Sequence, residues 1–102
     1  MQNILIIGTG ALATMFAARF AGAGKTVTML GTWKNGIEAL IQGGACLVEA
    51  DGSGARFPVW ATSNPAEIKK VDLAFVLVKA WQTRRVAQQI LESLPGFFPV
   101  VT

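Results

Sequence analysis

The segment GTGALA, residues 8–13, constrains the fold of this chain more than any other feature, because it has the pattern G-x-G-x-x-A. It follows NILII, residues 3–7, a continuous apolar run typical of a strand buried on both faces. The alanine-rich stretch from Ala11 to Ala23 comes next and predicts a helix. In such a turn the first glycine permits the tight bend, and the second lets a pyrophosphate approach the backbone. The small third residue lets the helix pack close to the strand.

The free N–H groups and the partial positive charge at the start of a helix favour phosphate groups. The pattern therefore predicts a dinucleotide site at the strand-to-helix turn. Its alternative interpretation is a glycine turn without a ligand. The predicted site residues are Gly8, Thr9, Gly10, Ala11, Leu12 and Ala13.

Strands and helices alternate along the rest of the chain. Residues 26–30 (TVTML) predict a second strand, residues 72–78 (DLAFVLV) a fully buried one, residues 80–94 a helix, and residues 98–101 the start of another strand. This order predicts an α/β fold of the Rossmann type, with a doubly wound, mostly parallel sheet. The first helix is expected to bury Leu12, Met15, Phe16 and Phe20, which share one helical face.

The middle of the chain predicts smaller elements. Residues 34–42 favour a short helix, and Asn64-Pro65 favours another helix start, with asparagine as the cap. Residues 45–50 and 56–62 are expected to be strands on either side of a hairpin turn at DGSG, residues 51–54.

The stretch LGTWKN, residues 30–35, follows the second strand, where a dinucleotide site usually places an acidic residue on the ribose 2′-hydroxyl. Here the first acidic residue of the chain is Glu38. Thr32 and Lys34 would instead favour a 2′-phosphate, and so NADP over NAD. The alternative is that Lys34 only solvates a helix start. Lys79, directly after a predicted strand, and Gln82 lie where a ligand of an open α/β sheet binds, although Lys79 could equally be a surface residue.

Composition excludes several functions. There is no histidine and one cysteine, so an internal disulfide is excluded and a metal site is improbable. A net charge of +3 without a basic cluster argues against nucleic acid as a partner. No apolar run is long enough for a membrane span, and we expect a cytoplasmic protein. With 52% hydrophobic and 15% charged residues, this chain is expected to expose an apolar face and to self-associate.

NILIIGTGALAT at the start, TVTMLG, the DGSG region and above all KAWQT, residues 79–83, resemble the N-terminal domain of ketopantoate reductases (2-dehydropantoate 2-reductases). The resemblance runs over essentially all 102 residues and makes residues 1–102 an N-terminal dinucleotide-binding domain. It implies a parent enzyme that reduces the keto group of ketopantoate to give pantoate with NADPH, on the route to pantothenate and coenzyme A. It also implies that Lys79 and Gln82 contact the cofactor.

This chain departs from the family pattern after the second strand, where the family usually has an arginine for the 2′-phosphate and this sequence has Gly31-Thr32. The helical C-terminal domain, which holds the family's catalytic lysine, is absent, so we expect this chain to bind the cofactor without catalysing the reaction. Two alternatives stay open: the same domain of another NADP-dependent keto-acid reductase, and a stand-alone module that senses NADP.

Overall fold

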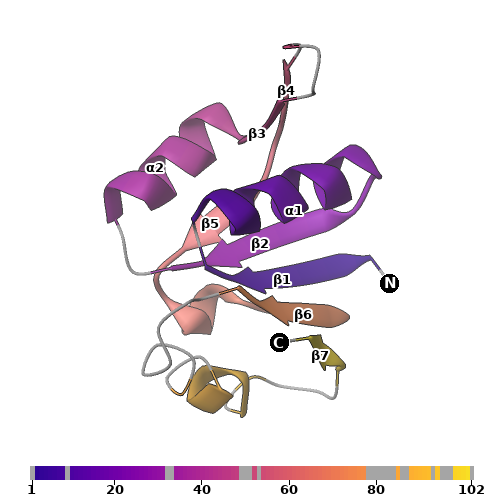
Figure 1. The fold of residues 1–102 in the computed structure, drawn as a ribbon. Helices are drawn as coiled ribbons and strands as arrows, with labels where there is room; N and C mark the ends of the chain where they lie inside the picture. Colours follow the sequence, from indigo (N-terminus) through magenta and orange to yellow (C-terminus); the bar gives the residue numbers. More distant parts are fainter. Residues whose placement is uncertain are drawn as a thin grey trace.

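A single parallel sheet forms the centre of the structure, a computed structural model (Figure 1). The structure describes residues 2–8, 10–31, 34–48, 52, 54–77, 85, 88–92, 94 and 98–101. The five strands lie in the order β5-β2-β1-β6-β7, and every neighbouring pair is parallel. Their bounds are β1 Asn3–Ile7, β2 Thr26–Leu30, β5 Trp60–Thr62, β6 Leu73–Val76 and β7 Val100–Val101. The predicted α/β, Rossmann-like class is confirmed.

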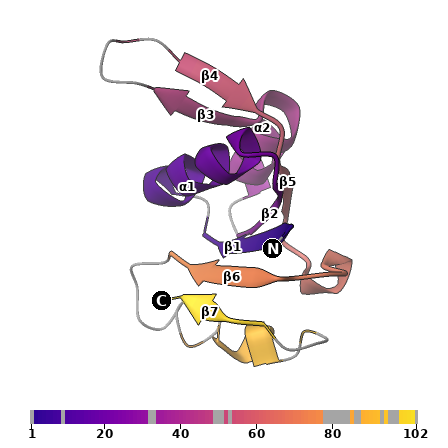
Figure 2. The same ribbon diagram turned by 90° about the vertical axis from the view of Figure 1, so that its right-hand side faces the viewer.

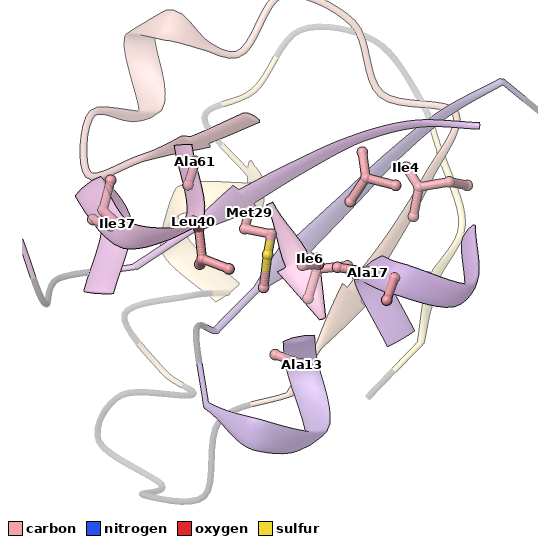
Figure 3. Close-up of a cluster of buried hydrophobic side chains, with 11 residues drawn as sticks. Ile4, Ile6, Ala13, Ala17, Met29, Ile37, Leu40 and Ala61 are labelled. Carbon is pink, nitrogen blue, oxygen red and sulfur yellow. The ribbon is translucent and has the colours of Figure 1, made fainter. Parts of the chain in front are cut away.

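Two layers of side chains cover the two faces of this sheet. Helices α1 (Ala11–Gly22) and α2 (Lys34–Gly43) pack on one face, over a cluster that includes Ile4, Ile6 and Met29 (Figure 3). On the other face Leu5 and Ile7 belong to a second buried cluster. This cluster also contains Leu91, from the helical residues 88–92, and Leu94, which follows them. The one-turn 3-10 helix η1 (Pro65–Glu67) lies on the opposite side of the sheet from α1 (Figure 2). β1 is therefore buried on both faces, as its sequence predicts.

The buried face of α1 differs from the predicted one. Leu12 is 52% exposed, whereas Ala13 and Ala17 are completely buried against the sheet (Figure 3). Phe16 and Phe20 are only half-buried. The Phe16 ring stacks with Phe75 of β6 at a centroid distance of 6.0 Å, and the Phe20 ring is tilted against Phe75 at 5.2 Å. The reason is the close approach of α1 to the sheet, which leaves room for methyl groups at the centre of the contact and places larger rings at its flank.

Residues 45–62 form two separate pieces of sheet. Strands β3 (Ala45–Val48) and β4 (Gly54–Phe57) make the predicted antiparallel hairpin, which lies next to α1 (Figure 2). The prediction of one strand over residues 56–62 was wrong, because the chain leaves the hairpin at Phe57 and joins the main sheet at Trp60. Pro58 lies between the two strands and has no N–H group to continue a ladder.

Three other predictions hold in part. Asn64 caps η1, as its Oδ1 accepts a hydrogen bond from the Ala66 N–H (3.1 Å), but the helix is a single turn. Of the predicted helix over residues 80–94, residues 85 and 88–92 are helical, with Leu91 buried and Glu92 exposed, while residues 80–84, 86, 87 and 93 lie outside the described residues. β6 was expected to be fully buried, yet its residues alternate between buried and half-buried.

A polar contact joins the amino ends of β1 and β6. One carboxylate oxygen of Asp72 accepts hydrogen bonds from the backbone N–H groups of Gln2 (3.0 Å) and Asn3 (2.8 Å) and from the Asn3 side chain (3.1 Å). The Asp72 N–H in turn donates to the Asn3 carbonyl (2.8 Å). The Asn3 and Gln2 N–H groups, followed by the Asn3 side chain, lower the pKa of the Asp72 carboxyl from 3.8 to about 2.

Candidate nucleotide-binding site

The carboxyl ends of the central strands meet at one edge of the sheet. Ile7, the last residue of β1, lies in register with Leu30 of β2 and with Val76 of β6. The Gly8 N–H donates to the Leu30 carbonyl (2.8 Å), and the Leu77 N–H donates to the Ile7 carbonyl (2.9 Å). The turns after these strands are therefore neighbours.

This edge also contains the point where the strand order reverses. From β1 the sheet continues to β2 and β5 on one side, and to β6 and β7 on the other. Open α/β sheets bind ligands outside the carboxyl ends of their strands, at such a switch point. The G-x-G-x-x-A turn begins at β1, so the structure places it where a ligand of this fold is expected.

Gly8 is required by the packing of the protein itself. Its φ is +136°, a backbone conformation that residues with side chains rarely adopt. A Cβ atom at Gly8 would lie 2.8 Å from the Leu77 carbonyl oxygen and 3.5 Å from the Ala13 Cβ. The positive φ fits the tight turn predicted for the first glycine, and the absence of a side chain also lets Leu77 and Ala13 approach it closely.

Gly10 is different, because neither its backbone nor its neighbours require a glycine. Its φ of −76° and ψ of −175° are extended values that any residue adopts. Among the described residues, a Cβ atom built at Gly10 would meet nothing within 4 Å. The described residues therefore leave the space beside Gly10 open.

The start of α1 faces this open space without a competing negative charge. Gly10 is the residue before the helix, it offers no side-chain cap, and the first turn has no acidic residue. The backbone N–H and the hydroxyl of Thr14 both donate to the Gly10 carbonyl, each at 2.9 Å, and so fix the first turn. The N–H groups of a first helical turn have no partner within the helix. The geometry suits a phosphate group.

The structure positions some of the predicted site residues and leaves others outside its description. Gly8, Gly10 and the start of α1 lie together at the carboxyl edge, with Leu12 exposed and Ala13 buried. Lys34 is the first residue of α2, but its side chain is not among those described. Thr9, Thr32, Lys79 and Gln82 lie outside the described residues, and their roles stay predictions.

One acidic residue at this edge was missed by the reasoning from sequence. The Gly31 N–H, directly after β2, donates to the carbonyl of Thr62 (3.1 Å), and the Thr62 hydroxyl donates to the carboxylate of Glu67. Glu67 is remote from Gly31 in sequence, so only the pairing of β5 with β2 brings them near one another. The sequence signal that could have indicated Glu67 was the strand-like WAT, residues 60–62, with the helix start NPAE, residues 64–67, shortly after it.

Within the described part of the chain, no group of three or more histidine, cysteine, aspartate or glutamate residues could hold a metal ion. None of the helices described there is long and apolar enough to cross a membrane.

Comparisons with known proteins show which family this chain is similar to. The family model of ketopantoate reductase PanE/ApbA matches residues 4–102. The 2-dehydropantoate 2-reductase of Archaeoglobus fulgidus is 34% identical over 96 residues, which are 94% of this chain and 30% of that protein. This chain therefore spans less than a third of the length of that relative.

Solved structures share the fold. The 2-dehydropantoate 2-reductase from Methylococcus capsulatus superimposes with a TM-score of 0.72 at 26% identity, over 92% of this chain and 30% of that one. A PanE/ApbA family ketopantoate reductase from Ralstonia eutropha JMP134 gives a TM-score of 0.83 at 23% identity, over 99% of this chain and 33% of that one. A D-mandelate dehydrogenase, solved with NADH and anilino(oxo)acetate, gives 0.71 at 23% identity, over 97% of this chain and 32% of that one.

Proposed function

Because this chain belongs to the ketopantoate reductase family, we propose that residues 1–102 are the NADP(H)-binding domain of a reductase that converts 2-dehydropantoate into pantoate. The reaction would supply pantoate for pantothenate and coenzyme A. This chain covers 30% of its curated relative, so the proposal assigns cofactor binding to this chain and the reduction to the longer parent. We expect the isolated chain to be inactive.

The observation that carries the proposal is the contrast between Gly8 and Gly10. The fold requires Gly8, whereas Gly10 leaves open space beside the start of α1 that the described residues do not use. A pyrophosphate needs such a close approach to the backbone. Helix α1 then offers its first N–H groups, with no acid in the first turn to oppose the ligand.

The remaining contacts proposed are polar and come from residues that follow β2 and β6 in the sequence. Lys79 and Gln82 would contact the cofactor, while Thr32 and Lys34 would contact the 2′-phosphate of NADP. A hydrogen bond to a charged group contributes about 1.5–3 kcal/mol, so one such bond would favour NADP over NAD by about tenfold to a hundredfold. When bound, the reduced cofactor supplies a hydride for the keto carbon of the substrate.

A second candidate function is the reduction of a different keto acid by the parent. The D-mandelate dehydrogenase solved with NADH shares this fold over 97% of the chain, so a different keto-acid reductase is the second candidate. A stand-alone module that senses NADP would need the same cofactor contacts. Expressing the gene beyond Thr102 and assaying the product with 2-dehydropantoate and other 2-keto acids separates these functions. Turnover of 2-dehydropantoate supports the first function, and turnover confined to another keto acid supports the second. Cofactor binding without any turnover leaves the sensing module.

A further inference from the structure

The fold brings the carboxylate of Glu67 to the part of the edge that follows β2. Leu30, the last residue of β2, lies in register with Thr62, the last residue of β5. The Gly31 N–H donates to the Thr62 carbonyl oxygen at 3.1 Å. The hydroxyl of the same threonine donates to Glu67 Oε2. Thr62 is therefore hydrogen-bonded both to the backbone of Gly31 and to the carboxylate of Glu67, and it links the two.

A short hydrogen-bonded turn holds this carboxylate in place. The Thr62 side chain is buried, and its oxygen also accepts from the Asn64 N–H (3.0 Å). The Glu67 N–H donates to the Asn64 carbonyl (3.1 Å), and the Asn64 side chain caps the same turn. The Thr62 hydroxyl has one hydrogen, and it is directed at Glu67. Glu67 itself is exposed, so the described protein does not cover its carboxylate at this edge.

We infer that Glu67 is a specificity-determining residue that weakens the binding of NADP relative to NAD. The inference rests on the proposed function, because it needs a dinucleotide across this edge. In such sites the adenosine ribose lies beyond the carboxyl end of the second strand. Here the second strand is β2, and Gly31 is the residue that follows it. A 2′-phosphate there adds about −1.5 to −2 charge, by analogy with other phosphomonoesters. The Glu67 carboxylate repels that charge and leaves a free 2′-hydroxyl unaffected.

The test is the Glu67→Gln variant of this chain, titrated with NADP and with NAD. Glutamine keeps an oxygen that can accept from Thr62 and removes only the charge. We expect the Kd for NADP to fall by about two- to tenfold, with the Kd for NAD unchanged. Raising the ionic strength should shrink the difference between wild type and variant, since salt screens a charge effect and not a change of shape. Glu92→Gln, an exposed residue on the helix at residues 88–92, removes the same charge as a control and should leave the ratio unchanged.

Four results would overturn the inference. An unchanged NADP to NAD ratio in Glu67→Gln, with wild type binding both nucleotides, contradicts the role of Glu67 and leaves the proposed function standing. An equal shift in Glu92→Gln, or a shift that does not depend on salt, contradicts it as well. If wild type binds neither nucleotide, the proposed function fails, and the inference fails with it.

Discussion

Gly8 and Gly10 lie two positions apart in one motif, yet the structure predicts opposite consequences for their replacement by alanine. Gly8→Ala should destabilise the protein, because the alanine would need a φ near +136° and its Cβ would lie 2.8 Å from the Leu77 oxygen. Backbone strain of this kind costs about 1–3 kcal/mol, and relief of the clash adds to it. For a domain of about this size, each 1 kcal/mol lowers the Tm by about 4–8 °C.

Gly10→Ala should leave the free protein intact. The backbone at Gly10 is already extended, and the added methyl group would meet no described atom within 4 Å. Alanine before a helix is less favourable than glycine by about 0.5–1 kcal/mol, which corresponds to a Tm change of about 2–8 °C. Nucleotide affinity should fall by about ten- to a hundredfold, because a methyl group in the space of a closely packed pyrophosphate costs about 1–3 kcal/mol.

The two variants are matched controls for one another. Thermal unfolding without nucleotide gives the stability, and calorimetric titration with NADP gives the affinity. The reasoning is refuted if Gly10→Ala binds as tightly as wild type, or if it loses as much stability as Gly8→Ala.

Three other predictions concern the edges of the sheet and the cofactor preference. Asp72→Asn should lower the Tm at neutral pH and approach wild type only below about pH 2. The native pKa of Asp72 lies below its usual 3.8, so its stabilisation is present above about pH 4 and is lost as pH falls through about 2. Equal melting curves at pH 7 would contradict it. Lys34→Ala should weaken NADP binding by about tenfold or more in a titration and leave NAD binding unchanged; an equal loss for both would exclude contact with the 2′-phosphate. Light scattering should show oligomers as concentration rises, since Trp60 (51% exposed), Val100 (38%) and Val101 (46%) expose apolar surface on the edge strands; a monomer at high concentration would refute this.

The parts of the fold that were predictable from the sequence depend on local patterns. NILII is apolar at every position after Asn3, and β1 is buried on both faces. The turn at Gly8 and the hairpin pairing of β3 with β4 follow from glycine placement and short strand-like runs. Each of these features is determined by residues that lie within or directly beside it in the sequence.

The parts that were not predictable depend on which distant segments meet. Leu12 is as apolar as a core residue, but the close packing of α1 selects Ala13 and Ala17 for the centre of the contact. Glu67 approaches the candidate site only because β5 pairs with β2, so a search for an acid within the residues after β2 does not find it. The sequence has no acidic residue before Glu38. The edge of the sheet nevertheless has a negative charge, that of Glu67, because β5 pairs with β2.

The central claim is that the carboxyl edge beside Gly10 binds a nicotinamide dinucleotide. Calorimetric titration of this chain with NADP and with NAD, under identical conditions, tests it most directly. We predict saturable binding of one nucleotide per chain, with NADP the tighter ligand. Absence of binding for both nucleotides would contradict the claim, and equal affinities would contradict the preference assigned to Thr32 and Lys34.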